Sequence, residues 1–290
     1  MTRKVMFQGT SSGVGKTLLT AGVCRYLQRQ GQDVAPYKTL NLSLNSYVTK
    51  DGGEIGISQA FQAWACGIEP TVDMNPVLLK PKGEGGLQVV LKGRPYVDVN
   101  RERGVGREVF LEAIDDCFGR LSAKHNNIVL EGSGSPAEIN LRKHEVANMT
   151  TAQRTDSPVI LIGDIEKGGV FAALYGTYFL LPDEHKRLVK GFVINRFRGD
   201  GSILGKGIER LEKEMGVPCL GVLPYLQMRF PEEDSLSMST GCSGSGDDIK
   251  KVWMSNLDRF VDEALSQMDL ALLEKIMDDG TKELASRGHP

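Results

Sequence analysis

Residues 9–17, which read GTSSGVGKT, are of the types that bind the phosphates of a nucleotide. Glycines let a backbone turn its N–H groups inward around phosphate oxygens, and a helix that begins at Gly15 or Lys16 adds partial positive charge. Lys16 would reach the β- and γ-phosphates, and the Thr17 hydroxyl would ligate Mg²⁺. The predicted nucleotide-binding residues of this segment are Gly9, Thr10, Ser11, Ser12, Gly13, Val14, Gly15, Lys16, Thr17 and Leu18.

The spacing of this loop departs from the usual phosphate-binding pattern, G-x-x-x-x-G-K-[ST]. The first glycine is Gly9, whereas position 10 holds Thr10. A glycine-rich turn without a ligand is the alternative interpretation. The adjacent Gly-Lys-Thr, with a strand before it and a helix after it, favours phosphate binding.

The elements that must position this loop alternate between short apolar runs and longer amphipathic stretches. Several runs are continuous in Val, Ile and Leu, which is typical of strands buried on both faces. Alternation of strands and helices predicts a doubly wound α/β fold with a mostly parallel sheet. The predicted strands are 4–8, 33–37, 88–91, 127–131, 158–163, 191–195 and 219–223, and the predicted helices are 16–30, 108–121, 170–181 and 204–215.

The composition divides the chain into three parts. Residues 1–238 carry the strand–helix alternation, and residues 239–248 are a Gly/Ser-rich connection. Residues 249–290 form a helical tail whose apolar positions recur at helical spacing, which predicts one or two helices packed on the main domain or on a partner. Its apolar residues are Leu257, Phe260, Val261, Ala264, Leu265 and Met268.

Overall composition excludes several classes of protein. The formal net charge of the 290 residues is −2, so no global field favours nucleic acid or an anionic membrane. The apolar runs are far shorter than the roughly 18 residues of a spanning helix, and the N-terminus has no secretory apolar region. The five cysteines are scattered without a C-x-x-C pair, which indicates reduced thiols. We therefore expect a cytoplasmic protein with no membrane or nucleic-acid partner.

The displaced glycine has a parallel in one group of enzymes. The loop resembles the G-T-x-x-x-x-G-K-T loop of dethiobiotin synthetase and its relatives, in which ATP usually activates a carboxylate. Over residues 5–236 the chain resembles cobyric acid synthase, the corrin-amidating enzyme of cobalamin biosynthesis. The segments that carry the resemblance include VDMNPVLLKP, VLEGSGSPAEINL, DIEKGGVFA, GFVINRFRGD and GVLPY. The resemblance implies a P-loop NTPase fold that uses ATP and Mg²⁺.

The resemblance also assigns roles to residues outside the loop. Glu131 and Glu54 correspond to Mg²⁺ ligands, and Lys38 to a lysine that faces phosphate and the acceptor carboxylate. Asn195 corresponds to the asparagine that reads adenine, with Pro224 in the same nucleotide site. Arg196 and Arg198 either flank the base or are structural. A solvated surface pair is the alternative for Glu54 and Lys38, because charged residues are mostly exposed.

The implied reaction is ATP-dependent amidation of corrin-ring carboxylates, from adenosylcobyrinic acid a,c-diamide to cobyric acid, through an acyl phosphate. The implied catalytic residues are Lys16, Lys38, Asp164 and Lys167. Asp164 would ligate Mg²⁺ or orient the nucleophile, and Lys167 would contact the acyl phosphate. An ion pair at a helix start is the alternative for these two, since Asp is also a good N-cap. Predicted substrate-binding residues are Asn41, Asn45, Ser46, Asn75, Ser133, Ser135, Asn140 and Arg142.

Cobyric acid synthases normally carry a glutaminase domain, and no such motif occurs in this sequence. Cys242 lies in the Gly/Ser-rich stretch rather than in a nucleophile turn. We therefore expect ammonia from a separate glutaminase or from free ammonium, and the family implies a homodimer. Two alternatives stay open: amidation of a different tetrapyrrole carboxylate, as in cobyrinic acid a,c-diamide synthase, and a non-catalytic nucleotide-dependent subunit that binds a corrinoid.

Overall fold

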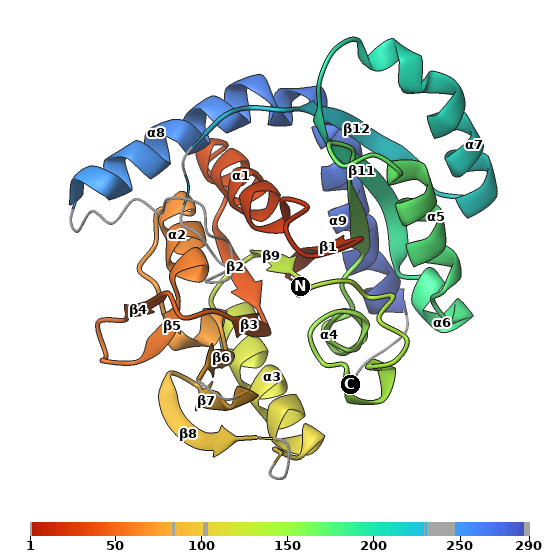
Figure 1. Ribbon diagram of the computed structural model, residues 1–290. Helices are drawn as coiled ribbons and strands as arrows, with labels where there is room; N and C mark the ends of the chain where they lie inside the picture. Colours follow the sequence, from red (N-terminus) through yellow and green to blue (C-terminus); the bar gives the residue numbers. More distant parts are fainter. Residues whose placement is uncertain (1, 83–84, 101–103, 229, 231–246, 287–290) are drawn as a thin grey trace.

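The core of the protein is a six-stranded parallel sheet, seen in a computed structural model that describes residues 2–82, 85–100, 104–228, 230 and 247–286 (Figure 1). The strand order is β12-β11-β10-β1-β9-β2, and every neighbouring pair is parallel. The doubly wound α/β prediction is thereby confirmed. The strands are β1 (Arg3–Gly9), β2 (Val34–Lys38), β9 (Asn127–Glu131), β10 (Val159–Asp164), β11 (Val189–Phe197) and β12 (Cys219–Pro224).

Helices cover both faces of this sheet because its strands are apolar on both sides. Along β1, Val5 and Phe7 join one core, whereas Met6 joins the core on the opposite face. The first face is covered by α1 (Lys16–Arg29) with α8 (Asp247–Glu263) and α9 (Leu270–Ser286). The second face is covered by α3 (Arg107–Ser122), α4 (Met149–Arg154), α5 (Val170–Phe179) and α7 (Gly205–Met215), and α6 (Asp183–Lys186) follows α5.

A smaller lobe is inserted between β2 and α3. It holds a four-stranded sheet in the order β3-β6-β7-β8, a two-stranded sheet of β4 and β5, and the helix α2 (Ile57–Ala65). The predicted strand 88–91 exists, but it lies in this second sheet rather than in the main one. The strands are β3 (Leu40–Leu42), β4 (Ser46–Val48), β5 (Glu54–Gly56), β6 (Val77–Pro81), β7 (Leu87–Leu91) and β8 (Arg94–Val99).

The helices α8 and α9 of the C-terminal region pack on the main sheet. Phe260 of α8 contacts α1 at Gly22, where an added Cβ would lie 2.6 Å from the Phe260 ring. Arg3 of β1 pairs with Glu274 and Asp278 of α9. Residues 239–246 of the predicted Gly/Ser-rich connection lie outside the described residues, and residues 247 and 248 begin α8. Within the described part of the chain, no helix is long and apolar enough to cross a membrane.

Candidate nucleotide and metal site

The phosphate-binding loop joins β1 to α1, and its displaced glycine has a structural reason. Thr10 N–H donates to Ile162 O at 2.9 Å, so position 10 still belongs to the strand ladder with β10. At Gly9, an added Cβ would lie 2.5 Å from Val14 Cγ2 and 3.0 Å from Lys16 Nζ. Because a side chain at position 9 would strike the loop as it turns back, glycine is needed there.

Two further glycines set the turn of the loop. Gly13 and Gly15 have φ values of 74° and 100°, a region that favours glycine. An added Cβ at Gly15 would lie only 2.3 Å from Asn195 Nδ2. That nitrogen donates to Val14 O at 2.8 Å, so the Asn195 amide fastens the loop to the end of β11.

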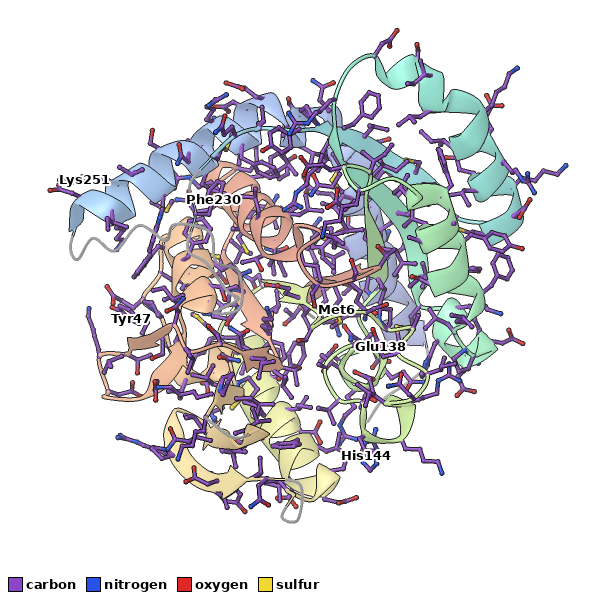
Figure 2. The ribbon with its side chains drawn as sticks, in the orientation of Figure 1. Met6, Tyr47, Glu138, His144, Phe230 and Lys251 are labelled. Carbon is purple, nitrogen blue, oxygen red and sulfur yellow. The ribbon has the colours of Figure 1, made fainter. Side chains whose placement is uncertain are left out.

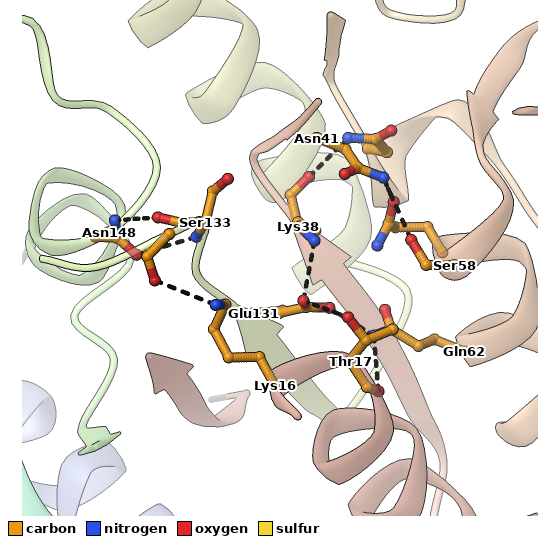
Figure 3. A network of polar contacts seen from close by, with 12 residues as sticks. Lys16, Thr17, Lys38, Asn41, Ser58, Gln62, Glu131, Ser133 and Asn148 are labelled. Atoms are coloured by element: carbon orange, nitrogen blue, oxygen red, sulfur yellow. Dashed lines mark hydrogen bonds and ion pairs between the residues drawn. The ribbon is translucent and has the colours of Figure 1, made fainter. Parts of the chain in front are cut away.

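Lys16 lies at the centre of the site. Its Nζ donates to Ser11 O at 3.0 Å and to Gly134 O at 3.1 Å, so the ammonium lies between the loop and the segment that follows β9 (Figure 3). The residue is 6% exposed. A largely buried ammonium held by carbonyl oxygens is placed to exchange these acceptors for phosphate oxygens.

Glu131, at the carboxyl end of β9, is the hub of a buried polar cluster (Figure 3). Its Oε1 accepts from Thr17 Oγ1 at 2.8 Å and from Lys38 Nζ at 2.9 Å. Its Oε2 accepts from Gln62 Nε2 of α2 at 2.7 Å. Lys38 and Glu131 are 3% and 1% exposed. Lys38 is therefore buried with Glu131, and it does not form the solvated surface pair with Glu54 that was the alternative interpretation. The parallel register pairs Lys38 with Glu131 across neighbouring strands, which brings the two side chains together.

The residues present fit a divalent cation of the Mg²⁺ type. Thr17 and Glu131 bring a hydroxyl and a carboxylate oxygen to one point beside the phosphate loop. Within the described residues, no group of three or more His, Cys, Asp or Glu could hold a metal by itself. Mg²⁺ suits such a sparse site, because it keeps several waters and binds through one or two protein oxygens plus substrate phosphates.

Glu54, the other predicted metal ligand, lies in a different setting. Its carboxylate pairs with Lys80 of β6 and accepts a hydrogen bond from Ser46. Burial opposes ionisation of Glu54, but these partners and the charge of Lys80 hold its pKa below the usual range. A metal role for Glu54 therefore stays a prediction, and it would require exchange of the Lys80 partner.

A cavity of 520 Å³ opens beside the loop at the first turn of α1. Its lining includes the predicted residues Leu18, Asn195, Arg196 and Pro224 together with Tyr225, Phe61 and Phe230, and Phe260 of α8 closes one side. The ring centroids of Phe230 and Phe61 are 5.7 Å apart. Figure 2 labels Phe230. A cavity next to a phosphate loop, lined by aromatic rings together with a few polar side chains, has the character of a nucleotide-base pocket.

Asp164 and Asn195 are neighbours across β10 and β11. Asp164 Oδ2 pairs with Arg196 Nη1 of β11 at 2.9 Å, and Oδ1 accepts from Glu166 N at 2.9 Å, so both carboxylate oxygens are already engaged. Arg196 has a φ of 63°, an uncommon conformation for a residue other than glycine. Lys167 follows on an exposed turn. Catalytic roles for Asp164 and Lys167 stay predictions.

Arg198 lies farther along the same edge of the site. Its guanidinium is 3.4 Å from the centroid of the Tyr225 ring, and it pairs with Glu166 at 2.8 Å. Because Tyr225 lines the cavity, the guanidinium stacks on its wall.

Seven of the eight predicted acceptor residues fall into three groups, and the eighth, Ser46, hydrogen-bonds Glu54. Asn41 and Asn75 are buried and hold the backbone and α2: Asn41 donates to Gln59 Oε1 at 2.9 Å, and Asn75 donates to Lys38 O at 3.0 Å. Ser133 and Ser135 line the segment after β9, where Ser133 O accepts from Asn148. Asn45, Asn140 and Arg142 are exposed.

Several residues of the site were not predicted from the sequence. Gln62 lies three positions after Gln59 on a helix whose other residues, apart from Ser58, are apolar, and this i, i+3 pair of amides was a signal that could have been used. Tyr225, Phe230 and Phe260 reach the cavity through long-range packing, which no local spacing reveals.

Comparison with known proteins places the chain in a family. Residues 5–235 match the model of the CobQ/CobB/MinD/ParA nucleotide binding domain. The chain belongs to this family. Its nucleotide-binding character agrees with the loop and cavity described above, and the CobQ/CobB/MinD/ParA match covers the main sheet and the inserted lobe.

Curated relatives in this family carry the name expected from the sequence motifs. The probable cobyric acid synthase of Methanosarcina barkeri is 51% identical over 239 residues, which cover 81% of this chain and 49% of that protein. The cobyric acid synthase of Vibrio parahaemolyticus is 50% identical, over 80% of this chain and 49% of that protein. The probable cobyric acid synthase of Methanococcoides burtonii is 44% identical, over 98% of this chain and 60% of that protein. The resemblance is therefore confirmed, and the chain spans about half the length of the first two relatives.

Among solved structures, chloroplast FtsY from Physcomitrella patens is similar, with a TM-score of 0.46 and 15% identity over 78% of this chain and 60% of that chain.

Proposed function

We propose that this chain catalyses ATP-dependent amidation of corrin-ring carboxylates, converting adenosylcobyrinic acid a,c-diamide to cobyric acid. The observation that carries the proposal is the buried cluster of Thr17, Lys38 and Glu131 beside the Lys16 loop. The relatives named cobyric acid synthase support the acceptor. A metal-binding hydroxyl, a carboxylate and a second lysine at one phosphate loop suit transfer of a phosphoryl group to a carboxylate.

The chemistry would proceed in two steps. An acceptor carboxylate oxygen attacks the γ-phosphorus of ATP, the bond to the β–γ bridging oxygen breaks, and ADP leaves with that electron pair. Ammonia then attacks the acyl carbon of the resulting acyl phosphate, phosphate leaves, and the nitrogen loses a proton to give the amide. Lys16 would stabilise charge on the β- and γ-phosphates. Lys38 would turn from Glu131 to the acceptor carboxylate, whose charge it neutralises.

Mg²⁺ would screen the phosphate charge and orient the γ-phosphate. Thr17 and Glu131 would hold it, and Glu54 would join them only after leaving Lys80. The lining of the 520 Å³ cavity would bind the base, with Asn195 reading adenine.

The surroundings of the two lysines suit a large, partly apolar acceptor. The segments after β2 and after β9 leave the same edge of the sheet from neighbouring strands. They expose Leu42 and Leu44 on one segment and Ile139 and Leu141 on the other, each between 42% and 58% exposed. Exposed apolar side chains among amides and serines match a macrocycle that carries polar arms.

The described cysteines favour an external source of nitrogen. Burial raises the pKa of Cys66 and Cys117, the latter to about 12, and raises that of Cys219 to about 11. A glutaminase nucleophile needs a thiolate, which these environments disfavour. Cys242 lies outside the described residues. We therefore propose that ammonia reaches this site from a source other than these three cysteines.

The test is an amidation assay with the purified chain, ATP, Mg²⁺, ammonium and adenosylcobyrinic acid a,c-diamide. Mass spectrometry should show stepwise conversion of carboxyl to carboxamide groups, with ADP formed in step. Lys16→Met should abolish the product, because the developing phosphate charge loses its main cation. Binding of ATP without any amide product would overturn the proposal. If amide forms only when cobyrinic acid replaces the a,c-diamide, the chain uses the acceptor of the alternative enzyme, cobyrinic acid a,c-diamide synthase.

A further inference from the structure

Gln62 is a buried amide that bridges two elements of the metal site. Its Nε2 donates to Glu131 Oε2 at 2.7 Å and reaches Thr17 O at 3.3 Å (Figure 3). The side chain belongs to α2 in the inserted lobe, whereas Glu131 and Thr17 belong to β9 and α1 of the main fold. Gln62 thus touches both residues whose oxygens converge on the predicted cation.

The other end of this amide lacks a partner. Gln62 is 0% exposed, and its Oε1 is a buried acceptor without a hydrogen-bond donor. The orientation of the amide is fixed by chemistry, since an ionised carboxylate only accepts and the nitrogen must face Glu131. A buried acceptor left without a donor costs about 1–3 kcal/mol, so a donor is expected when the site is filled.

The two oxygens of Glu131 are divided between different partners. Oε1 faces Thr17 and Lys38, whereas Oε2 is held by Gln62. A cation bound beside Thr17 would therefore meet Oε1, and Gln62 would keep Oε2 turned away from it. Partners of this kind orient metal ligands, and their loss typically weakens metal affinity about 10–100-fold.

From these contacts we infer that Gln62 is a positioning residue for the divalent cation. Its Nε2 fixes Glu131 as a ligand through one oxygen, and its Oε1 accepts a hydrogen bond from a water of the cation's hydration shell. Mg²⁺ retains several waters when protein-bound, so such a donor is available. The inference rests on the Mg·ATP site of the proposed function, but not on the identity of the acceptor.

The test measures metal binding directly. Mn²⁺ is titrated into the full chain with saturating adenylyl imidodiphosphate, an ATP analogue that resists hydrolysis, and free Mn²⁺ is followed by electron paramagnetic resonance. Gln62→Met, which keeps the length of the side chain and removes both hydrogen-bonding atoms, should weaken Mn²⁺ binding about 10–100-fold. Binding of the analogue without metal should stay unchanged.

Gln59→Met is the matched control. Gln59 lies on the same helix, is also 0% exposed and also has one amide atom without a partner, but its Oε1 accepts from Asn41 rather than contacting Glu131. It should leave Mn²⁺ affinity within about threefold, well below the effect of losing a partner of a metal ligand.

Equal Mn²⁺ affinity in wild type and Gln62→Met, or equal losses in both variants, would overturn the inference. If Gln62→Met does not fold, Gln62→Asn takes its place, since a shorter amide cannot span the same contacts, and the same outcomes apply. If the wild-type chain binds Mn²⁺ with the analogue but forms no amide, the proposed function is contradicted and the inference about Gln62 is not.

Discussion

At the scale of single residues, Gly13 and Gly15 test how the loop is built. Both have positive φ, which costs a residue with a Cβ roughly 1–2 kcal/mol. A Cβ at Gly13 would meet nothing within 4 Å, whereas one at Gly15 would lie 2.3 Å from Asn195 Nδ2. We expect Gly15→Ala to lose at least about tenfold more affinity for ATP than Gly13→Ala, equivalent to about 1.4 kcal/mol. Isothermal titration measures both, and equal losses would contradict this account of the clash.

The buried pair of Lys38 and Glu131 supplies a second test at this scale. Lys38→Met leaves Glu131 as a buried carboxylate without its cation, which should cost about 3–5 kcal/mol of unfolding free energy. Adding Glu131→Gln removes the stranded charge, so the double variant should be more stable than the sum of the two single changes predicts. Urea unfolding of all four proteins gives the coupling energy. Additive effects would mean that the pair is not coupled.

At the scale of elements, α8 contributes to both the core and the nucleotide cavity. Phe260 is 3% exposed, packs on Gly22 of α1 and lines the cavity. Phe260→Ala should lower the unfolding free energy by about 3–5 kcal/mol and should also weaken ATP binding, because one wall of the base pocket is lost. Val252→Ala on the same helix, where Val252 is 51% exposed, is the control and should change neither. Thermal unfolding and ATP titration check both variants. Normal ATP binding by Phe260→Ala would show that α8 does not contribute to the nucleotide site.

The same elements explain what the sequence could predict. The strands of the main sheet were predicted closely because their Val and Ile runs are buried on both faces, and 127–131 coincides with β9. Of the strands of the inserted lobe only β7 was predicted, and β3, β4 and β5 were missed because they have only three residues each, too few to show a strand period. Within the site, the loop glycines and Lys16 could be predicted because they lie next to one another in the sequence. Gln62 and Phe260 reach it through tertiary packing, which local spacing does not encode.

At the scale of the whole molecule, α9 ties the C-terminal region to the first strand. Glu274 accepts hydrogen bonds from Arg3, Gln32 and Tyr26, which belong to β1, to the segment after α1 and to α1 itself. Burial opposes ionisation of this carboxyl, but hydrogen bonds from Gln32, Tyr26 and Arg3 and the charge of Arg3 hold its pKa below the usual range. Ionised Glu274 therefore stabilises the folded chain.

The pH dependence of this contact can be worked out from the sign of the shift. A carboxyl whose pKa is lower in the folded state contributes fully above its unfolded pKa, about 4.3, and loses that contribution as pH falls through the lower, folded value. The difference in unfolding free energy between wild type and Glu274→Gln should thus be larger at about pH 7 than at about pH 3. Glu263→Gln removes an exposed i, i+4 pair with Arg259 and should change stability by about 0.5 kcal/mol or less. Urea unfolding across this pH range measures both variants. A gap for Glu274→Gln that stays constant with pH would show that its carboxylate charge does not hold α9 to β1.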